Sequence, residues 1–127
     1  MGADSSIFDK KSKRFYYFDR DYNFRAGSGH PDANTIVEKL NNQDDDTLEY
    51  DTITADEVIR LATLNMVFWE AQGTKDWHRV NWNRSIMAFA RAFPDGEFFV
   101  VSDHQSPNAW EIEDRGYTAW EPPKGSD

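Results

Sequence analysis

The chain of 127 residues contains no cysteine. This absence excludes disulfides, thiolate metal ligands and cysteine nucleophiles together, and it is typical of proteins that stay in a reducing compartment. No apolar run approaches the roughly 20 residues of a membrane-spanning helix, and the N-terminus has no apolar segment of the secretory type. We therefore expect a cytoplasmic protein that does not enter a membrane.

The familiar signatures of catalysis are also missing. The loop Gly27–Asp32 is rich in glycine but has no Gly-Lys-Ser or Gly-Lys-Thr to hold a phosphate. Ser102, Asp103 and His104 are adjacent, yet the Gly-x-Ser-x-Gly elbow of a serine hydrolase is absent. The three histidines show no His-x-x-x-His spacing, so we expect no metal and no cofactor. His104 is the one weak catalytic candidate, as a general base, because it follows a strand-like segment.

Acidic residues outnumber basic ones by 23 to 14, which gives a net charge of −9. The excess is concentrated in two blocks. Residues 26–57 carry nine acidic and one basic side chain, and residues 94–127 carry eight and two. Such a protein repels phosphate backbones and attracts basic partners. We expect no direct binding to nucleic acid and a partner protein with a basic surface.

The N-terminus and the aromatic N-terminal segment each allow a second interpretation. Gly2 and Ser6 match the N-myristoylation pattern, and basic residues follow, but the pattern is short and common by chance. We expect an ordinary initiator segment. Basic residues interleaved with Phe15–Phe18 resemble a platform for single-stranded nucleic acid. Strand alternation explains the same residues, and the acidity of the chain favours a core role.

The best-defined element is a helix from Thr54 to Gly73. Thr54 and Glu57 form a capping box, and Gly73 suits the left-handed residue that ends a helix. Between them the residues are apolar on most of the circumference, which predicts a helix buried between layers. A second helix is expected to start at Asn83 or Ser85 and to bury Ile86, Met87, Phe89, Ala90 and Phe93.

The remaining segments predict strands and one short helix. Residues 6–8 and 14–18 form an aromatic hairpin, with a possible third strand at 22–25. A helix is expected at about 31–42 and a short strand at 48–53. Residues 97–102 are apolar almost throughout, which favours a central strand. Residues 109–113 and 117–121 flank Asp114-Arg115-Gly116, which predicts a hairpin with Trp110 opposite Trp120.

These elements predict a single α+β domain over residues 1–127, with frayed ends at 1–5 and 122–127. About five antiparallel strands form the sheet. The central helix and one or two further helices cover one face of it.

The sequence favours an interaction module over an enzyme. Nineteen of the residues are aromatic, and Trp, Tyr and Arg dominate binding hot spots. We expect an inhibitor or immunity-type protein that engages a basic partner through acidic and aromatic surface. The alternative is a phosphate- or nucleotide-binding protein, or a small hydrolase, that uses the Trp/His/Arg cluster at 77–84 or His104. The predicted partner-binding residues are Asp44, Asp45, Asp46, Glu49, Asp51, Trp77, Arg79, Trp82 and Arg84.

Overall fold

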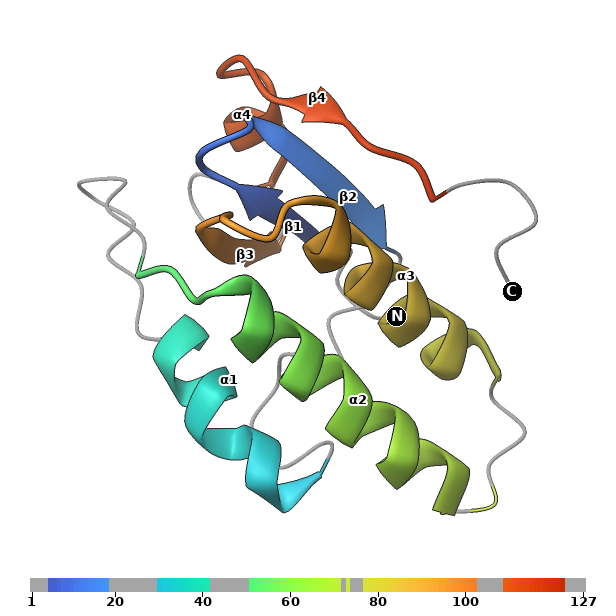
Figure 1. Ribbon diagram of the computed structural model, residues 1–127. Helices are drawn as coiled ribbons and strands as arrows, with labels where there is room; N and C mark the ends of the chain where they lie inside the picture. Colours follow the sequence, from blue (N-terminus) through green and yellow to red (C-terminus); the bar gives the residue numbers. More distant parts are fainter. Residues whose placement is uncertain are drawn as a thin grey trace.

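The computed structural model describes residues 5–18, 30–41, 51–71, 73, 77–102 and 109–122. A small sheet lies against one end of a layer of helices, in which two long helices run side by side (Figure 1). The elements in chain order are β1 (Ser5–Asp9), β2 (Arg14–Phe18), the 3-10 turn η2 (Pro31–Ala33), α1 (Asn34–Asn41), α2 (Ala55–Ala71), α3 (Trp77–Ala92), β3 (Phe98–Ser102), α4 (Ala109–Glu113) and β4 (Thr118–Ala119).

The sheet has the strand order β3-β1-β2-β4. β1 pairs antiparallel with both β2 and β3, whereas the two-residue β4 pairs parallel to β2. The prediction of about five antiparallel strands is therefore wrong for the described residues, which form four strands with one parallel pair. The aromatic hairpin is confirmed, and Lys13 closes it in the left-handed region at φ 60°.

β3 was expected at the centre of the sheet, but it lies at one edge among the described strands. On its outer side Phe98 makes an isolated bridge with Ile53. The continuous apolar run has a different cause, which is that both faces of the sheet are covered. Phe98 and Val100 belong to one core cluster, and Phe99 and Val101 belong to another.

α2 begins and ends where the sequence predicts. The amide of Thr54 donates to Oε1 of Glu57 at 3.0 Å, and the amide of Glu57 donates to Oγ1 of Thr54 at 3.1 Å, which is a capping box. Gly73 has φ 66°, and its amide donates to the carbonyl of Glu70. The expected burial around most of the circumference is wrong. The buried residues share one side of the helix, and Val67 is 54% exposed.

α3 begins at Trp77, well before the Asn83 or Ser85 predicted from capping preferences. Asn83 is buried inside the helix instead of capping it. The predicted apolar face is otherwise confirmed, because Ile86, Phe89 and Ala90 are buried and Phe93 packs against them. The cluster of α2 and α3 covers the side of the sheet that carries Ile7 and Val100.

The opposite face of the sheet is covered as well, so the expectation that helices cover only one face is wrong. Residues 109–113 form the helix α4 and not a hairpin strand, and Ala109 and Ile112 are buried against Phe8 and Phe15. Trp120 therefore does not face Trp110. Its ring lies 6.1 Å from that of Tyr16 and 5.2 Å from that of Phe89, on the side of the long helices.

Some predicted segments lie partly or wholly outside the described residues, namely the strand at 22–25, the first half of the strand at 48–53, and the chain ends at 1–4 and 123–127. The helix expected at about 31–42 is confirmed over 31–41 as η2 followed by α1. In the part of the chain that is described, no helix has both the length and the hydropathy needed to cross a membrane.

Candidate protein interface

The structure describes only some of the predicted partner-binding residues. Asp44, Asp45, Asp46 and Glu49 lie outside the described residues, as does His104. Trp77, Arg79 and Trp82 fall on the first half of α3, where the structure describes the backbone. Asp51 is exposed ahead of α2. Arg84 is exposed on α3, where its Nη1 donates to Oδ1 of Asn81 at 3.3 Å. These assignments stay predictions.

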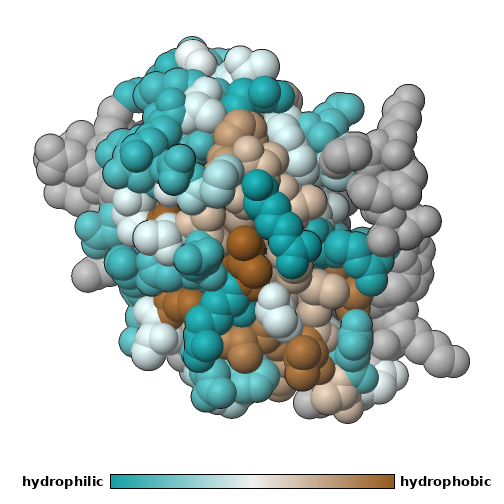
Figure 2. All heavy atoms as spheres, viewed as in Figure 1, coloured by the Kyte–Doolittle hydropathy of each residue, from teal (hydrophilic) through white to brown (hydrophobic). Residues whose placement is uncertain are grey.

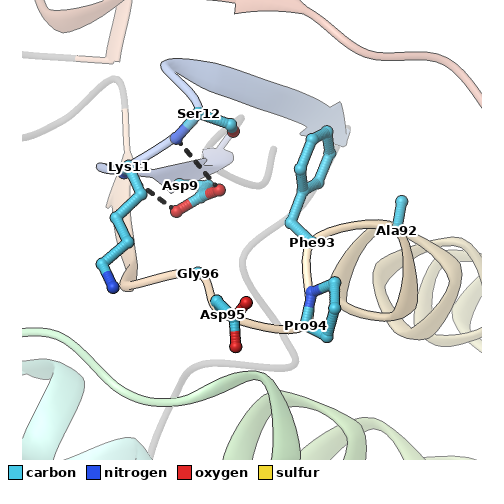
Figure 3. A pocket seen from close by; sticks show the side chains of 8 residues that line it. All are labelled: Asp9, Lys11, Ser12, Ala92, Phe93, Pro94, Asp95 and Gly96. Carbon is cyan, nitrogen blue, oxygen red and sulfur yellow. Dashed lines mark hydrogen bonds between the residues drawn. The ribbon is translucent and has the colours of Figure 1, made fainter.

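A hollow of about 320 Å³ lies between the β1–β2 turn and the turn at residues 93–96 (Figure 3). Asp9 is 1% exposed, and its carboxylate points into the turn. Its Oδ1 accepts from the amides of Lys11 at 3.0 Å and Glu97 at 2.9 Å, and its Oδ2 accepts from the amide of Ser12 at 3.3 Å. Gly96 permits this approach, since a Cβ there would lie 2.9 Å from Oδ1 of Asp9 and 2.6 Å from Cζ of Phe98.

This arrangement argues against an anion site at the hollow. Backbone amides bind phosphate when they are free and converge on one point. Here a carboxylate of the protein already accepts from those of Lys11, Ser12 and Glu97, and Asp95 adds a second acid to the lining. We therefore assign Asp9 a structural role, in which it joins the hairpin turn to the chain segment that enters β3.

His30 also has a structural role. Its backbone amide donates to Oδ1 of the buried Asn65 on α2 at 3.2 Å. Its Nδ1 accepts from the backbone amide of Asp32 at 3.0 Å, so this nitrogen carries no proton in that arrangement. The carboxylate of Asp32 lies 3.9 Å from Nδ1 and is largely exposed, so this pairing contributes little to stability. Among the described residues, no group of three or more His, Asp or Glu side chains could hold a metal ion.

The feature that best fits recognition is the outer side of α4. Trp110 is 63% exposed, the highest value among the large hydrophobic residues that the structure describes, and Tyr17 is 42% exposed. Register places Tyr17 opposite Ser6, so both lie on the sheet face that α4 covers. The hydroxyl of Ser6 donates to Oε2 of Glu113 at 3.0 Å. We define the α4 surface as Tyr17, Trp110, Glu111, Glu113 and Asp114.

Spacing on the helix brings these groups to one side. Trp110 and Glu113 are three residues apart and share a side of α4, and Asp114, the turn residue that follows the helix, lies four positions after Trp110. Ala109 and Ile112, on the other side, are buried in the core. The amide of Asp114 donates to the carbonyl of Trp110, and that of Tyr117 donates to the carbonyl of Glu113. Gly116 has φ 99°, a left-handed value that suits the turn leading to β4.

The anchoring of α4 affects the charge of its surface. Partial burial is the main cause that raises the pKa of Glu113; the hydrogen bond from Ser6 opposes this effect, and the nearby charge of Asp114 adds to it. The same cause raises the pKa of Tyr117, which lies beneath Lys13 with the ammonium 4.9 Å from its ring centroid. A basic group placed against Glu113 would favour its ionised form.

We predict that Glu113→Gln becomes more stable relative to the wild type as pH rises. Because the folded protein holds the Glu113 proton more tightly than the unfolded chain does, folding gains stability at acid pH and loses it as pH rises through the pKa in the folded state. The glutamine variant has no such loss. The difference should stay below about 1 kcal/mol because solvent reaches the side chain.

Urea unfolding of both proteins between pH 4 and pH 8 measures this difference. A Glu113→Gln variant that loses stability relative to the wild type over that range would show that the Ser6 hydrogen bond outweighs the cost of burial. Glu111→Gln, at an exposed position on the same helix, is the matched control and should show little change.

Sequence reasoning missed α4 because five residues fit two periodicities. Trp110 and Ile112 alternate as in a strand, whereas Ala109 and Ile112 have the spacing of one helix face. Asn108 followed by Glu111 three residues later is a helix-start pattern, and it was the available signal. Reading the segment as a helix would have separated Trp110 from Trp120.

Known proteins do not supply an identification. No protein-family model, no curated protein and no solved structure matches this chain. Its function must be argued from its own residues.

Proposed function

We propose that this protein is a small cytoplasmic interaction module, of the inhibitor or immunity type, that binds a basic partner protein without catalysis. The α4 surface is part of the interface. The observation that supports this most is the exposure of Trp110 next to three carboxylates. A partner that covers the indole and pairs with the acids gains both apolar contact and charge complementarity. The cysteine-free sequence supports the location.

The composition of the surface fits a protein partner better than a nucleic acid. Three of its five residues are acidic, and Arg115 is the basic residue next to them in the chain. The chain as a whole has a net charge of −9. These charges oppose an approaching phosphate backbone and accelerate encounter with Lys- and Arg-rich surfaces. Trp is also among the residues most enriched at binding hot spots.

We predict that Trp110→Ala weakens partner binding by at least about 30-fold, the effect of a hot spot of roughly 2 kcal/mol. Tagged wild-type and variant proteins are used to isolate partners from the native host at low and high salt. The protein retained by the wild type is then purified and titrated against each variant by calorimetry. Glu111→Gln combined with Asp114→Asn should weaken binding chiefly at low salt, where charge attraction is strongest.

The control is Asp32→Asn combined with Glu38→Gln, which removes the same charge from η2 and α1, away from α4. This variant should bind like the wild type. A partner that binds all variants equally, or that binds with no dependence on salt, would refute the proposal. All of these substitutions are at exposed positions, and all except Trp110→Ala change the side chain only slightly. Circular dichroism should therefore show the same fold for every variant.

A further inference from the structure

The outer side of α2 is the second unusual surface. Five residues are exposed at helical spacing, and Val67 is the large apolar one among them, at 54% exposure. The hydroxyl of the exposed Thr63 donates to the carbonyl of Ile59 at 2.7 Å, so it is bonded within α2. Figure 2 shows apolar residues at the surface in the region where Figure 1 draws α1 and α2. We define the α2 stripe as Arg60, Thr63, Val67, Glu70 and Ala71.

The order of residues along the stripe is complementary to itself. If two copies of α2 pack antiparallel, residues at equal distance from the crossing point face each other. If the helices cross at the level of Asn65, which is itself buried on the other side of α2, Arg60 of one copy faces Glu70 of the other, and Thr63 faces Val67. Each of these contacts occurs twice, so the twofold axis pairs opposite charges and places the exposed Val67 of each copy against Thr63 of the other, without any like-charge contact among them.

We propose that the protein forms a twofold-symmetric dimer through the α2 stripe, with a second copy of this chain as the occupant. A single exposed valine is ordinary on a protein surface. The self-complementary charge order is what selects a second copy over another partner. An interface of one helix face is smaller than the roughly 1,600 Å² of a stable complex, so the dimer exchanges rapidly and depends on concentration.

This dimer is independent of the α4 surface. α2 belongs to the core cluster on one side of the sheet, and α4 belongs to the cluster on the other side. Pairing through the stripe therefore leaves Trp110 exposed in both copies. A failure of one proposal leaves the other intact.

Charge reversal tests the pairing directly. Arg60→Glu places an acid against Glu70 at both symmetry-related contacts, and Glu70→Arg places two bases together. Each variant should raise the dissociation constant of the dimer at least about tenfold. The double variant Arg60→Glu with Glu70→Arg restores both opposite-charge contacts and should return the constant to within about threefold of the wild type. Sedimentation velocity over a concentration series measures all four proteins.

A cross-link fixes the register. Because the chain has no cysteine, Thr63→Cys and Val67→Cys each introduce one thiol at an exposed position. A mixture of the two proteins should form the disulfide-linked dimer faster than either protein alone, since these positions face each other across the axis. Thermal melts check that every variant is folded. A wild type that stays monomeric up to its solubility limit, or a double variant no tighter than the single ones, would overturn the proposal.

Discussion

Asp9→Ala should lower the free energy of unfolding by about 3 kcal/mol, although Asp9 belongs to neither of the two proposed interfaces. Its carboxylate accepts from the amides of Lys11, Ser12 and Glu97, which are not paired to backbone carbonyls in a strand ladder. Removing an acceptor from a partly buried donor costs roughly 1–3 kcal/mol, and solvent entering the hollow offsets part of the total. Gly96 and Phe98 pack closely around the site, so relaxation is limited.

Two further variants separate the effect of the lost hydrogen bonds from the effect of the lost charge and from the effect of changing the lining of the hollow. Asp9→Asn keeps one oxygen for Lys11 and Glu97 but turns an amide group toward Ser12, so we expect about half of the loss. Asp95→Ala removes an exposed acid that lines the same hollow and should change stability by no more than about 0.5 kcal/mol. Urea unfolding followed by tryptophan fluorescence measures all three.

Hydrogen exchange gives a second measurement that depends on the mechanism. The amides of Lys11 and Glu97 should exchange faster in Asp9→Ala than the remaining hairpin amides do, because they lose their acceptor. An Asp9→Ala variant as stable as Asp95→Ala, with both amides still protected, would show that the backbone finds other acceptors. Asp9 would then be an ordinary turn residue.

Local sequence signals determined the ends of α2 and the turns. The capping box at Thr54 and Glu57 and the left-handed Gly73 depend on a few neighbouring residues, and both are present in the structure. The aromatic hairpin likewise needed only alternation and a polar turn. Such features are readable because the chemistry that creates them lies within a short stretch of chain.

The layers of the fold were not readable from local signals. The apolar run of β3 indicated burial on both faces, but burial on both faces does not require a central position in the sheet. α4 covers the second face, and its five residues are helical because Ala109 and Ile112 fill the space beside Phe8 and Phe99. A helix this short owes its stability to packing, so its own propensity could not reveal it.

The interface proposed on α4 differs in place from the residues that the sequence predicted, and both stay proposals. Composition favoured recognition through acidic and aromatic groups, which is still a prediction, and Trp110 on α4 and Asp114 in the turn after it are groups of these two kinds. The prediction placed the acids at Asp44–Asp46, outside the described residues, because the charge run is densest there. Trp110 was assigned to a pair with Trp120, so its exposure could not be expected. Surface position depends on tertiary contacts, which a local pattern does not contain.

Phe8→Ala should cost about 3–5 kcal/mol, a large share of the roughly 5–15 kcal/mol that stabilises a domain of this kind. Phe8 has no exposed surface. Its ring stacks on Phe99 at 5.0 Å between centroids, meets Tyr117 edge-on at 5.2 Å and lies 5.7 Å from Phe15. Since β1 lies between β2 and β3, the cavity would form beneath α4 in the middle of the sheet.

Comparison with Phe89→Ala tests whether α4 is a full layer of the fold. Phe89 is equally buried, but in the cluster of the long helices on the opposite side of the sheet. If both faces of the sheet are closely packed, Phe8→Ala and Phe89→Ala should lower the free energy of unfolding by similar amounts. Tyr17 is half-exposed on the α4 side, so Tyr17→Ala should lower it by about 1 kcal/mol or less. A sheet covered by helices on one side alone would make Phe8→Ala as mild as Tyr17→Ala. Chemical denaturation of the three variants distinguishes these cases, because a shared loss at Phe8 and Phe89 requires close packing on both sides of β1.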